Sequence, residues 1–246
     1  MIKSLVKRDL KSRYKGSVLG FFWMLLNPLL QLFIYTIVFS TIMRMGIDKF
    51  YLFLFVALVP WLFFSTCLTG GTGVIFSQQD MVKKIYFPRE VLPISYTVSQ
   101  FVNMLLSFIV IFVVIYISEV TIHFNALIYL PIVMIIEFIL ALGITYIVSS
   151  LNVYFRDLEH ILGILSMAWM YLTPILYPVE LVPEQYMKII YLNPMTSIII
   201  AYRDILYYGK APDSGDLWMA GVSGVCVLIA GQVLFGILQR HFVEEL

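Results

Sequence analysis

The chain has 246 residues, of which 61% are hydrophobic and 13% are charged, and its mean hydropathy is +0.93. A water-soluble globule of this size cannot enclose so much apolar surface, so the composition indicates an integral membrane protein. The formal net charge of +1 argues against a nucleic-acid-binding protein, which needs a concentrated basic surface. Cys67 and Cys226 lie within apolar runs, which argues against a disulfide framework or a zinc site.

Four stretches without a charged residue each exceed the about 20 apolar residues that cross a bilayer. They are residues 16–43, 50–79, 91–118 and 217–239. Lipid cannot satisfy exposed backbone hydrogen bonds, and these runs are too long for barrel strands, so we expect spanning helices. The sequence predicts an all-α integral membrane protein, a single domain over residues 1–246, with six transmembrane helices.

The N-terminal segment, residues 1–15, is predicted to be an amphipathic helix lying on the membrane surface. Ile2, Leu5 and Leu10 recur at helical spacing, and six basic residues surround them. Such a helix is typical of a lipid anchor, and its basic groups also lie where an anionic lipid headgroup would approach. The candidate headgroup-binding residues are Arg8, Lys11, Arg13 and Lys15.

The first two predicted spans are residues 20–43 and 51–76, and Pro60 is expected to kink the second. A charged connector, residues 80–90, follows them and reads as a short helix that stops before Pro88. The third and fourth predicted spans are residues 93–117 and 126–154.

The fifth predicted span is residues 161–179, and the sixth is residues 217–238. Between them, repeated prolines break the chain into pieces too short to cross the membrane. Asn193 and Pro194 have the pattern of a helix start, and Gly209 that of a helix stop. Residues 184–208 are therefore predicted to form two short re-entrant helices at the outer face.

Six spans place both termini on the same side of the membrane. Eleven of the 16 lysine and arginine residues then fall on the side of the termini, and five fall on the opposite side. Because cytoplasmic loops carry the excess of basic residues, the termini are predicted to be cytoplasmic.

The sequence contains no recognisable catalytic or metal-binding pattern. The glycine-rich residues 70–73 match neither nucleotide-binding fingerprint. His123, His160 and His241 are far apart and have no metal-ligand or catalytic-triad spacing. The sequence therefore predicts no catalytic residue, no metal site and no cofactor in this chain.

Glu137 is the one ionisable residue deep within a predicted span. An acidic group at a helix centre costs about 2.5–3.5 kcal/mol, so it needs a partner or water. It is either a carboxylate lining a transport pathway or a hydrogen-bonded contact between helices.

Aromatic residues make up 16% of the chain. Tyrosine and tryptophan collect at both membrane interfaces, where they act as anchors. Alternatively, some of the flat rings face a channel, where they would slide along the CH faces of sugars. The candidate channel-lining aromatics are Phe22, Trp23, Trp169, Tyr171 and Tyr177.

Three segments in this order resemble the membrane subunits of ABC-2 type transporters that export polysaccharides, the O-antigen, capsule and teichoic acid permeases. The resemblance covers nearly the whole chain. The segments are residues 8–23 with Asn27 and Pro28, residues 83–93, and residues 152–157 followed by Pro174, Tyr177, Pro178 and residues 193–196.

The resemblance implies the permease subunit of an ATP-driven exporter, which moves a lipid-linked polysaccharide out of the cytoplasm across the bacterial inner membrane. Two copies would form a homodimeric pore lined by spans one and five, with the outer helices as its gate. Each copy would dock a separate ATPase subunit, which would supply ATP and Mg²⁺. This chain would then be a transport subunit and not an enzyme.

In that family the connector between spans two and three is the coupling helix, which inserts into the ATPase. The loop after span four faces the same partner. The resemblance therefore implies these ATPase-docking residues: Asp80, Lys83, Lys84, Ile85, Tyr86, Phe87, Arg89, Glu90, Arg156 and Asp157.

Other functions are compatible with parts of this pattern. An ABC-2 permease for a small drug or a lipid would share the architecture. A membrane-embedded transferase would need several polar catalytic groups at one depth, whereas Glu137 stands alone. A purely structural membrane subunit would not require the basic N-terminal helix or the charged connector.

Overall fold

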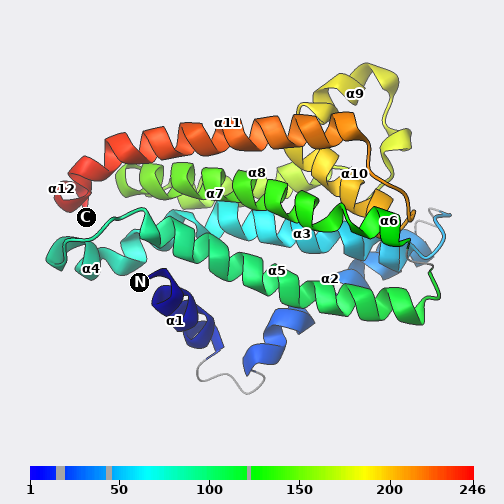
Figure 1. Cartoon of the computed structure of the whole chain (residues 1–246), viewed down its shortest axis with the longest axis horizontal. Helices are drawn as coiled ribbons and strands as arrows, with labels where there is room; N and C mark the ends of the chain where they lie inside the picture. Colours follow the sequence, from blue (N-terminus) through cyan, green and yellow to red (C-terminus); the bar gives the residue numbers. More distant parts are fainter. Residues whose placement is uncertain (15–19, 43–45, 121–122) are drawn as a thin grey trace.

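The computed structural model describes residues 1–14, 20–42, 46–120 and 123–246, and these contain helices and no strand (Figure 1). An all-α membrane protein is therefore confirmed for this part of the chain. The helices are α1 (Ile2–Tyr14), α2 (Trp23–Thr36), α3 (Phe50–Gly70), α4 (Gln79–Lys84), α5 (Val91–Ile117), α6 (Phe124–Leu127), α7 (Leu130–Tyr154), α8 (Leu158–Leu172), α9 (Glu184–Tyr191), α10 (Pro194–Leu206), α11 (Ser214–Leu238) and α12 (Phe242–Glu245).

Four helical stretches are long and apolar enough to cross a membrane. They are Phe50–Gly70, Val91–Ile117, Phe124–Tyr154 and Ser214–Glu245. Two shorter apolar helices, Leu25–Ser40 and Leu158–Leu172, stand where the first and fifth spans are predicted. Several membrane-crossing helices are thus confirmed, and the count of six stays a prediction.

Helix α3 lies at the centre of the bundle and packs against α2, α5, α7, α8 and α10. Its side chains from Leu52 to Leu58 are all at most 1% exposed. A helix that is apolar on every side is buried on every side, which matches this position. The helix continues through Pro60 to Gly70.

The predicted second span extends to residue 76, whereas α3 ends at Gly70 and two short 3-10 turns follow, Thr72–Val74 and Phe76–Gln78. A β-carbon at Gly70 would lie 2.2 Å from the Tyr96 hydroxyl oxygen. The glycine-rich run therefore allows α5 to approach the end of α3.

Helices α7 and α11 form another close contact through two glycines. A β-carbon at Gly143 would lie 2.6 Å from the Leu228 backbone nitrogen, and one at Gly231 would lie 2.5 Å from the Gly143 carbonyl oxygen. Small residues at a helix interface let two backbones approach closely in a membrane. This packing attaches α11 to the rest of the bundle.

The fifth predicted span is shorter than expected, since α8 ends at Leu172 and the prediction runs to residue 179. Thr173 is extended because it precedes Pro174, and the chain does not return to an α-helix until α9. Helix α10 begins at the Asn193 cap, whose side chain accepts a hydrogen bond from the Met195 nitrogen at 3.1 Å. Most of α10 is buried, whereas α9 extends from one end of the molecule (Figure 1).

Candidate functional sites

The connector between α3 and α5 presents large apolar side chains to solvent. Helix α4 is only six residues long, and the chain beyond it, residues 85–90, is not helical. Ile85 is exposed and Tyr86 is fully exposed. Exposed aromatic and aliphatic side chains on a charged loop are typical of a protein-binding surface. We call residues 80–90 the connector surface.

Charged residues of the connector surface have different surroundings. Lys84 and Asp80 form an exposed ion pair at 3.3 Å, which contributes at most about 1 kcal/mol. Lys83 and Glu90 are exposed. Arg89 instead turns towards the C-terminal segment, where its guanidinium donates a hydrogen bond to the Gln239 carbonyl and lies 6.0 Å from the Phe242 ring. Arg89 therefore attaches the connector to the C-terminal segment.

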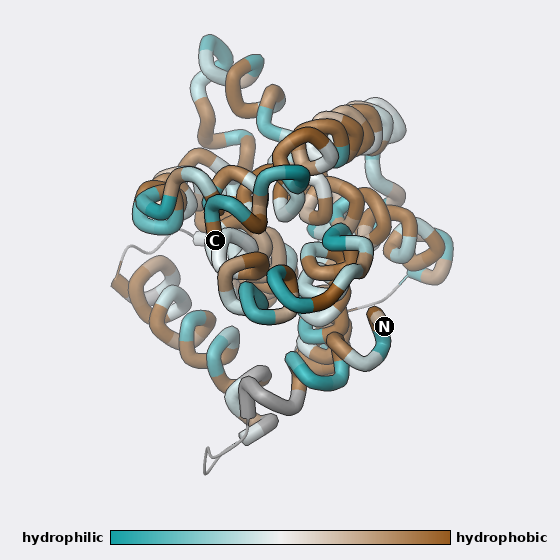
Figure 2. Tube along the Cα trace, turned by 90° about the vertical axis from the view of Figure 1, so that its left-hand side faces the viewer, coloured by the Kyte–Doolittle hydropathy of each residue, from teal (hydrophilic) through white to brown (hydrophobic). Residues whose placement is uncertain are grey.

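The loop between α7 and α8 contributes the other two predicted docking residues. Arg156 and Asp157 are both exposed. The Arg156 guanidinium lies 4.9 Å from the Phe76 ring centroid, so this loop touches the segment that leads into the connector. Hydrophilic stretches gather at this end of the bundle, which also carries both termini (Figure 2).

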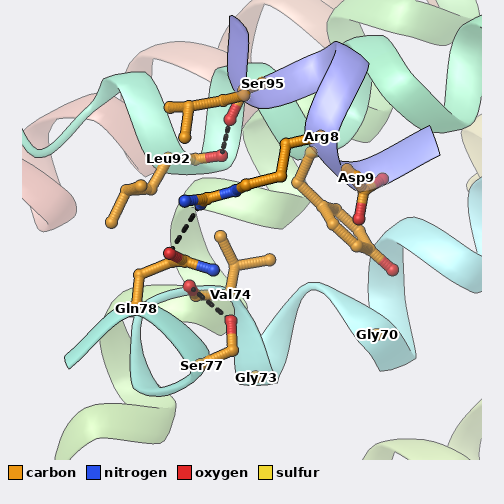
Figure 3. A pocket seen from close by; sticks show the side chains of 11 residues that line it. Arg8, Asp9, Gly70, Gly73, Val74, Ser77, Gln78, Leu92 and Ser95 are labelled. Atoms are coloured by element: carbon orange, nitrogen blue, oxygen red, sulfur yellow. Dashed lines mark hydrogen bonds between the residues drawn. The ribbon is translucent and has the colours of Figure 1, made fainter. Parts of the chain in front are cut away.

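A polar pocket of about 310 Å³ lies where α1 crosses the start of α5 and the turns after α3 (Figure 3). The Arg8 guanidinium donates a hydrogen bond to the Gln78 side-chain oxygen at 2.7 Å. Lys15 and the side chains of Lys11 and Arg13 lie outside the described residues. We call this the headgroup pocket, and its lining is Leu5, Arg8, Asp9, Gly70, Gly73, Val74, Ser77, Gln78, Leu92, Ser95 and Tyr96.

Glu137 forms a contact between two helices. The Tyr202 hydroxyl of α10 donates a hydrogen bond to one Glu137 carboxylate oxygen at 2.7 Å, and both residues have no exposed surface. This hydrogen bond joins α7 to α10 inside the bundle. The structure favours the contact between helices over a carboxylate that lines a transport pathway.

The candidate channel-lining aromatics do not form one cluster in a single protomer. Phe22 and Trp23 are exposed near the start of α2, and Tyr171 is exposed on α8. Trp169 packs edge-to-face on Phe64 of α3, with ring centroids 5.2 Å apart. The Tyr177 hydroxyl donates a hydrogen bond to the Tyr171 carbonyl at 3.0 Å.

Arg203 is a buried cation. The count of basic residues places it among the five on the side opposite the termini. It is 3% exposed, and its guanidinium lies 3.5 Å from the Phe53 ring centroid. The same group donates hydrogen bonds to the Pro174 and Ile175 carbonyls, both at 2.5 Å. A lone arginine in the apolar stripe of α10 is the sequence signal for this cluster.

A second polar cavity, of about 440 Å³, lies between the middle parts of α2, α3 and α5. Its polar residues recur at helical spacing in otherwise apolar helices, which is the signal that a search for charges overlooks. We call it the amide cleft, and its lining is Asn27, Pro28, Gln31, Val59, Leu62, Phe63, Thr66, Gln100, Asn103, Met104 and Ser107.

Residues 1–207 match the ABC-2 type transporter family. The chain belongs to this family. Family members are membrane transport subunits, which agrees with the bundle of apolar helices.

Several curated proteins are similar to this ABC-2 chain over nearly its full length. The O-antigen export system permease protein RfbA of Myxococcus xanthus is 36% identical over 100% of this chain and 95% of its own length. RfbA of Klebsiella pneumoniae is 32% identical over 98% of this chain and 93% of its own length. The polysialic acid transport protein KpsM of Escherichia coli is 21% identical over 95% of this chain and 92% of its own length.

Proposed function

We propose that this ABC-2 chain is the permease subunit of an ATP-driven exporter that moves a lipid-linked polysaccharide out of the cytoplasm. The observation that carries the proposal is similarity to O-antigen export permeases along the whole chain, including the segments that form the connector surface and the headgroup pocket. The chain is a transport subunit, and a separate ATPase subunit binds ATP and Mg²⁺.

The proposed topology has six spans and both termini in the cytoplasm, with the protein in the bacterial inner membrane. Helices α2 and α8 are the first and fifth spans, and α9 with α10 form the outer gate. The excess of basic residues on the side of the termini supports this orientation. Two copies form the pore, and Phe22, Trp23, Trp169, Tyr171 and Tyr177 line it.

The connector surface is proposed to dock the ATPase. Tyr86 and Ile85 supply exposed apolar area, and Lys83 and Glu90 supply charges that set the orientation of the partner. Arg156 and Asp157 extend the surface from the neighbouring loop. Because Arg89 ties the connector to the end of α11, a movement of the docked ATPase is passed directly to a spanning helix.

The headgroup pocket is proposed to receive the phosphate-bearing headgroup of the lipid carrier. Arg8 provides the cation of the pocket and donates a hydrogen bond to the Gln78 amide oxygen, while Asp9 is the acidic residue in the same lining. Lys11, Arg13 and Lys15 follow on the same basic segment. Their charges attract anionic lipid to this side of the protein.

Depletion of the protein in its host tests the proposal. Surface glycan is measured with a lectin or antibody in intact and permeabilised cells, and the lipid-linked pool is measured by extraction. We expect surface glycan to fall and lipid-linked glycan to accumulate inside, with recovery on re-expression. Unchanged surface glycan would contradict polysaccharide export and favour an ABC-2 permease for a small drug or lipid.

A further inference from the structure

The amide cleft presents hydrogen-bonding groups without charge inside the membrane-crossing part of the bundle. Its lining contains four side-chain amides and two hydroxyls and no ionisable residue. A charged ligand would find no counter-charge there, and burying an unpaired charge is strongly unfavourable. The chemistry of the cleft therefore suits a neutral, polar ligand.

Five of the six polar side chains of the cleft come from α2 and α5, and the sixth, Thr66, comes from α3. Asn27 and Gln31 are four residues apart on α2, while Gln100, Asn103 and Ser107 follow one face of α5. Each amide offers both donors and an acceptor, which is what a ligand with several hydroxyl groups requires.

The two hydroxyls of the cleft, on Thr66 and Ser107, donate to carbonyls of their own helices, so the amides are the groups that would bind a ligand. The Asn103 amide donates to the Gln100 side-chain oxygen at 3.3 Å, a longer distance than the usual about 2.9–3.0 Å. A ligand hydroxyl can replace so weak a contact. Phe63 and Met104 add apolar wall, against which the CH face of a sugar ring packs. The volume of about 440 Å³ is within the range of small-ligand sites.

The amide cleft lies directly beside the headgroup pocket along α3 and α5. Tyr96 lines the headgroup pocket one turn before Gln100, and its hydroxyl donates a hydrogen bond to the carbonyl of Thr66, which lines the cleft. A pocket that contains charged side chains, Arg8 and Asp9, is thus followed by a polar cavity lined only by uncharged ones. A lipid-linked glycan has the same order of groups, a charged phosphate followed by an uncharged sugar.

We propose that the amide cleft binds an uncharged sugar residue of the lipid-linked glycan while the adjoining phosphate lies in the headgroup pocket. This inference rests on the proposed function and adds a sugar subsite to it. Gln100 and Asn103 bind sugar hydroxyls from α5, and Gln31 binds them from α2.

The test uses the permease with its ATPase subunit in lipid nanodiscs. ATP hydrolysis is titrated with lipid-linked glycan and, separately, with the same polyprenyl pyrophosphate without sugar. We expect Gln100→Leu and Asn103→Leu each to raise the half-stimulating concentration of the glycan about tenfold, which corresponds to about 1.4 kcal/mol. The value for the sugar-free lipid stays unchanged.

Ser99→Ala is the matched control, because Ser99 is buried on the same helix, donates to its own helix at the Ser95 carbonyl, and does not line the cleft. It should leave both titrations unchanged. If a buried variant does not accumulate, Gln31→Leu replaces it, since Gln31 is half-buried at the side of the cleft, and the same selective loss is expected.

Three results would overturn the inference, and they are distinguishable. If the wild-type complex is stimulated by glycan and the variants match it, the cleft does not bind sugar. If the variants weaken both lipids equally, the amides only pack the helices. If glycan does not stimulate even the wild-type complex, the proposed function itself fails and the sugar subsite with it.

Discussion

Arg203 supplies hydrogen-bond donors at the point where α8 stops. The backbone after Leu172 is not helical, and its carbonyl groups would be unpaired in lipid, which tolerates irregular backbone only where the protein satisfies it. The guanidinium donates to the Pro174 and Ile175 carbonyls, and also to the Phe53 carbonyl at 3.3 Å. One side chain thus joins α10, the end of α8 and the central helix α3.

Arg203→Met should destabilise the protein, because it leaves several buried carbonyl groups without a donor. We expect a loss of about 3 kcal/mol or more and a fall in Tm on the order of 10 °C, measured by thermal unfolding in detergent. Lys188→Met, on the exposed surface of α9, is the control and should change Tm little. Equal Tm values for the two variants would show that the hydrogen bonds of Arg203 do not stabilise the segment after α8.

Single residues are where the sequence predicts least. Glu137 is recognisable as a costly buried acid, but its partner Tyr202 lies 65 positions away, so only the fold reveals the contact. Arg203 lies in a predicted outer helix, and its burial becomes known only from the packing of α10. The amides of Gln100 and Asn103 carry no charge and scarcely disturb the hydropathy of α5, so their shared cleft emerges only when α2 and α3 are placed.

At the scale of elements, hydrophobic periodicity and length predict most helices well. The predicted second, third, fourth and sixth spans correspond to α3, α5, α7 and α11, because only a helix satisfies the backbone of such a single apolar segment in lipid, whereas the first apolar run gives the shorter α2. Their ends are less predictable, since α3 stops at Gly70 where Tyr96 approaches and α8 stops before Pro174. At about 1.5 Å per residue, α8 reaches only about 22 Å, so the proposed fifth span would need the segment after α8, whose carbonyl groups Arg203 satisfies, to complete the crossing.

The connector surface is the element whose contribution to assembly is easiest to isolate. Tyr86→Ala should weaken binding of the ATPase by about 2 kcal/mol, or about 30-fold, because exposed aromatic side chains dominate such interfaces. The measurement is binding of purified ATPase to the permease in nanodiscs. Lys83→Glu should also weaken binding.

Tyr116→Ala is the matched control for the connector. Tyr116 is an exposed tyrosine near the other end of the long helix α5, so its loss removes similar apolar surface from the opposite end of the bundle. It should leave ATPase binding unchanged. If Tyr86→Ala and Tyr116→Ala bind the ATPase equally well, the connector surface is not the docking site.

At the scale of the whole molecule, the bundle has two chemically different ends. The connector, α12 and both termini share one end, while α9 and the start of α11 lie at the other (Figure 1). The cysteine content makes this arrangement testable, since Cys67 and Cys226 are the only two in the chain. Replacing both with serine allows one new cysteine at a time to report which side of the membrane it occupies.

In that background, we expect Lys188→Cys on α9 to react with a membrane-impermeant maleimide in intact spheroplasts. Lys84→Cys on α4 and Glu244→Cys on α12 should react only after permeabilisation, because the proposed topology of six crossings places the termini and the connector inside and α9 outside. The result depends on α2 and α8, the two short apolar helices. If α8 does not cross, Lys84→Cys and Lys188→Cys lie on the same side and Glu244→Cys lies on the other. If α2 does not cross, Lys84→Cys and Glu244→Cys still share a side, but a Lys3→Cys reporter on α1 lies opposite both.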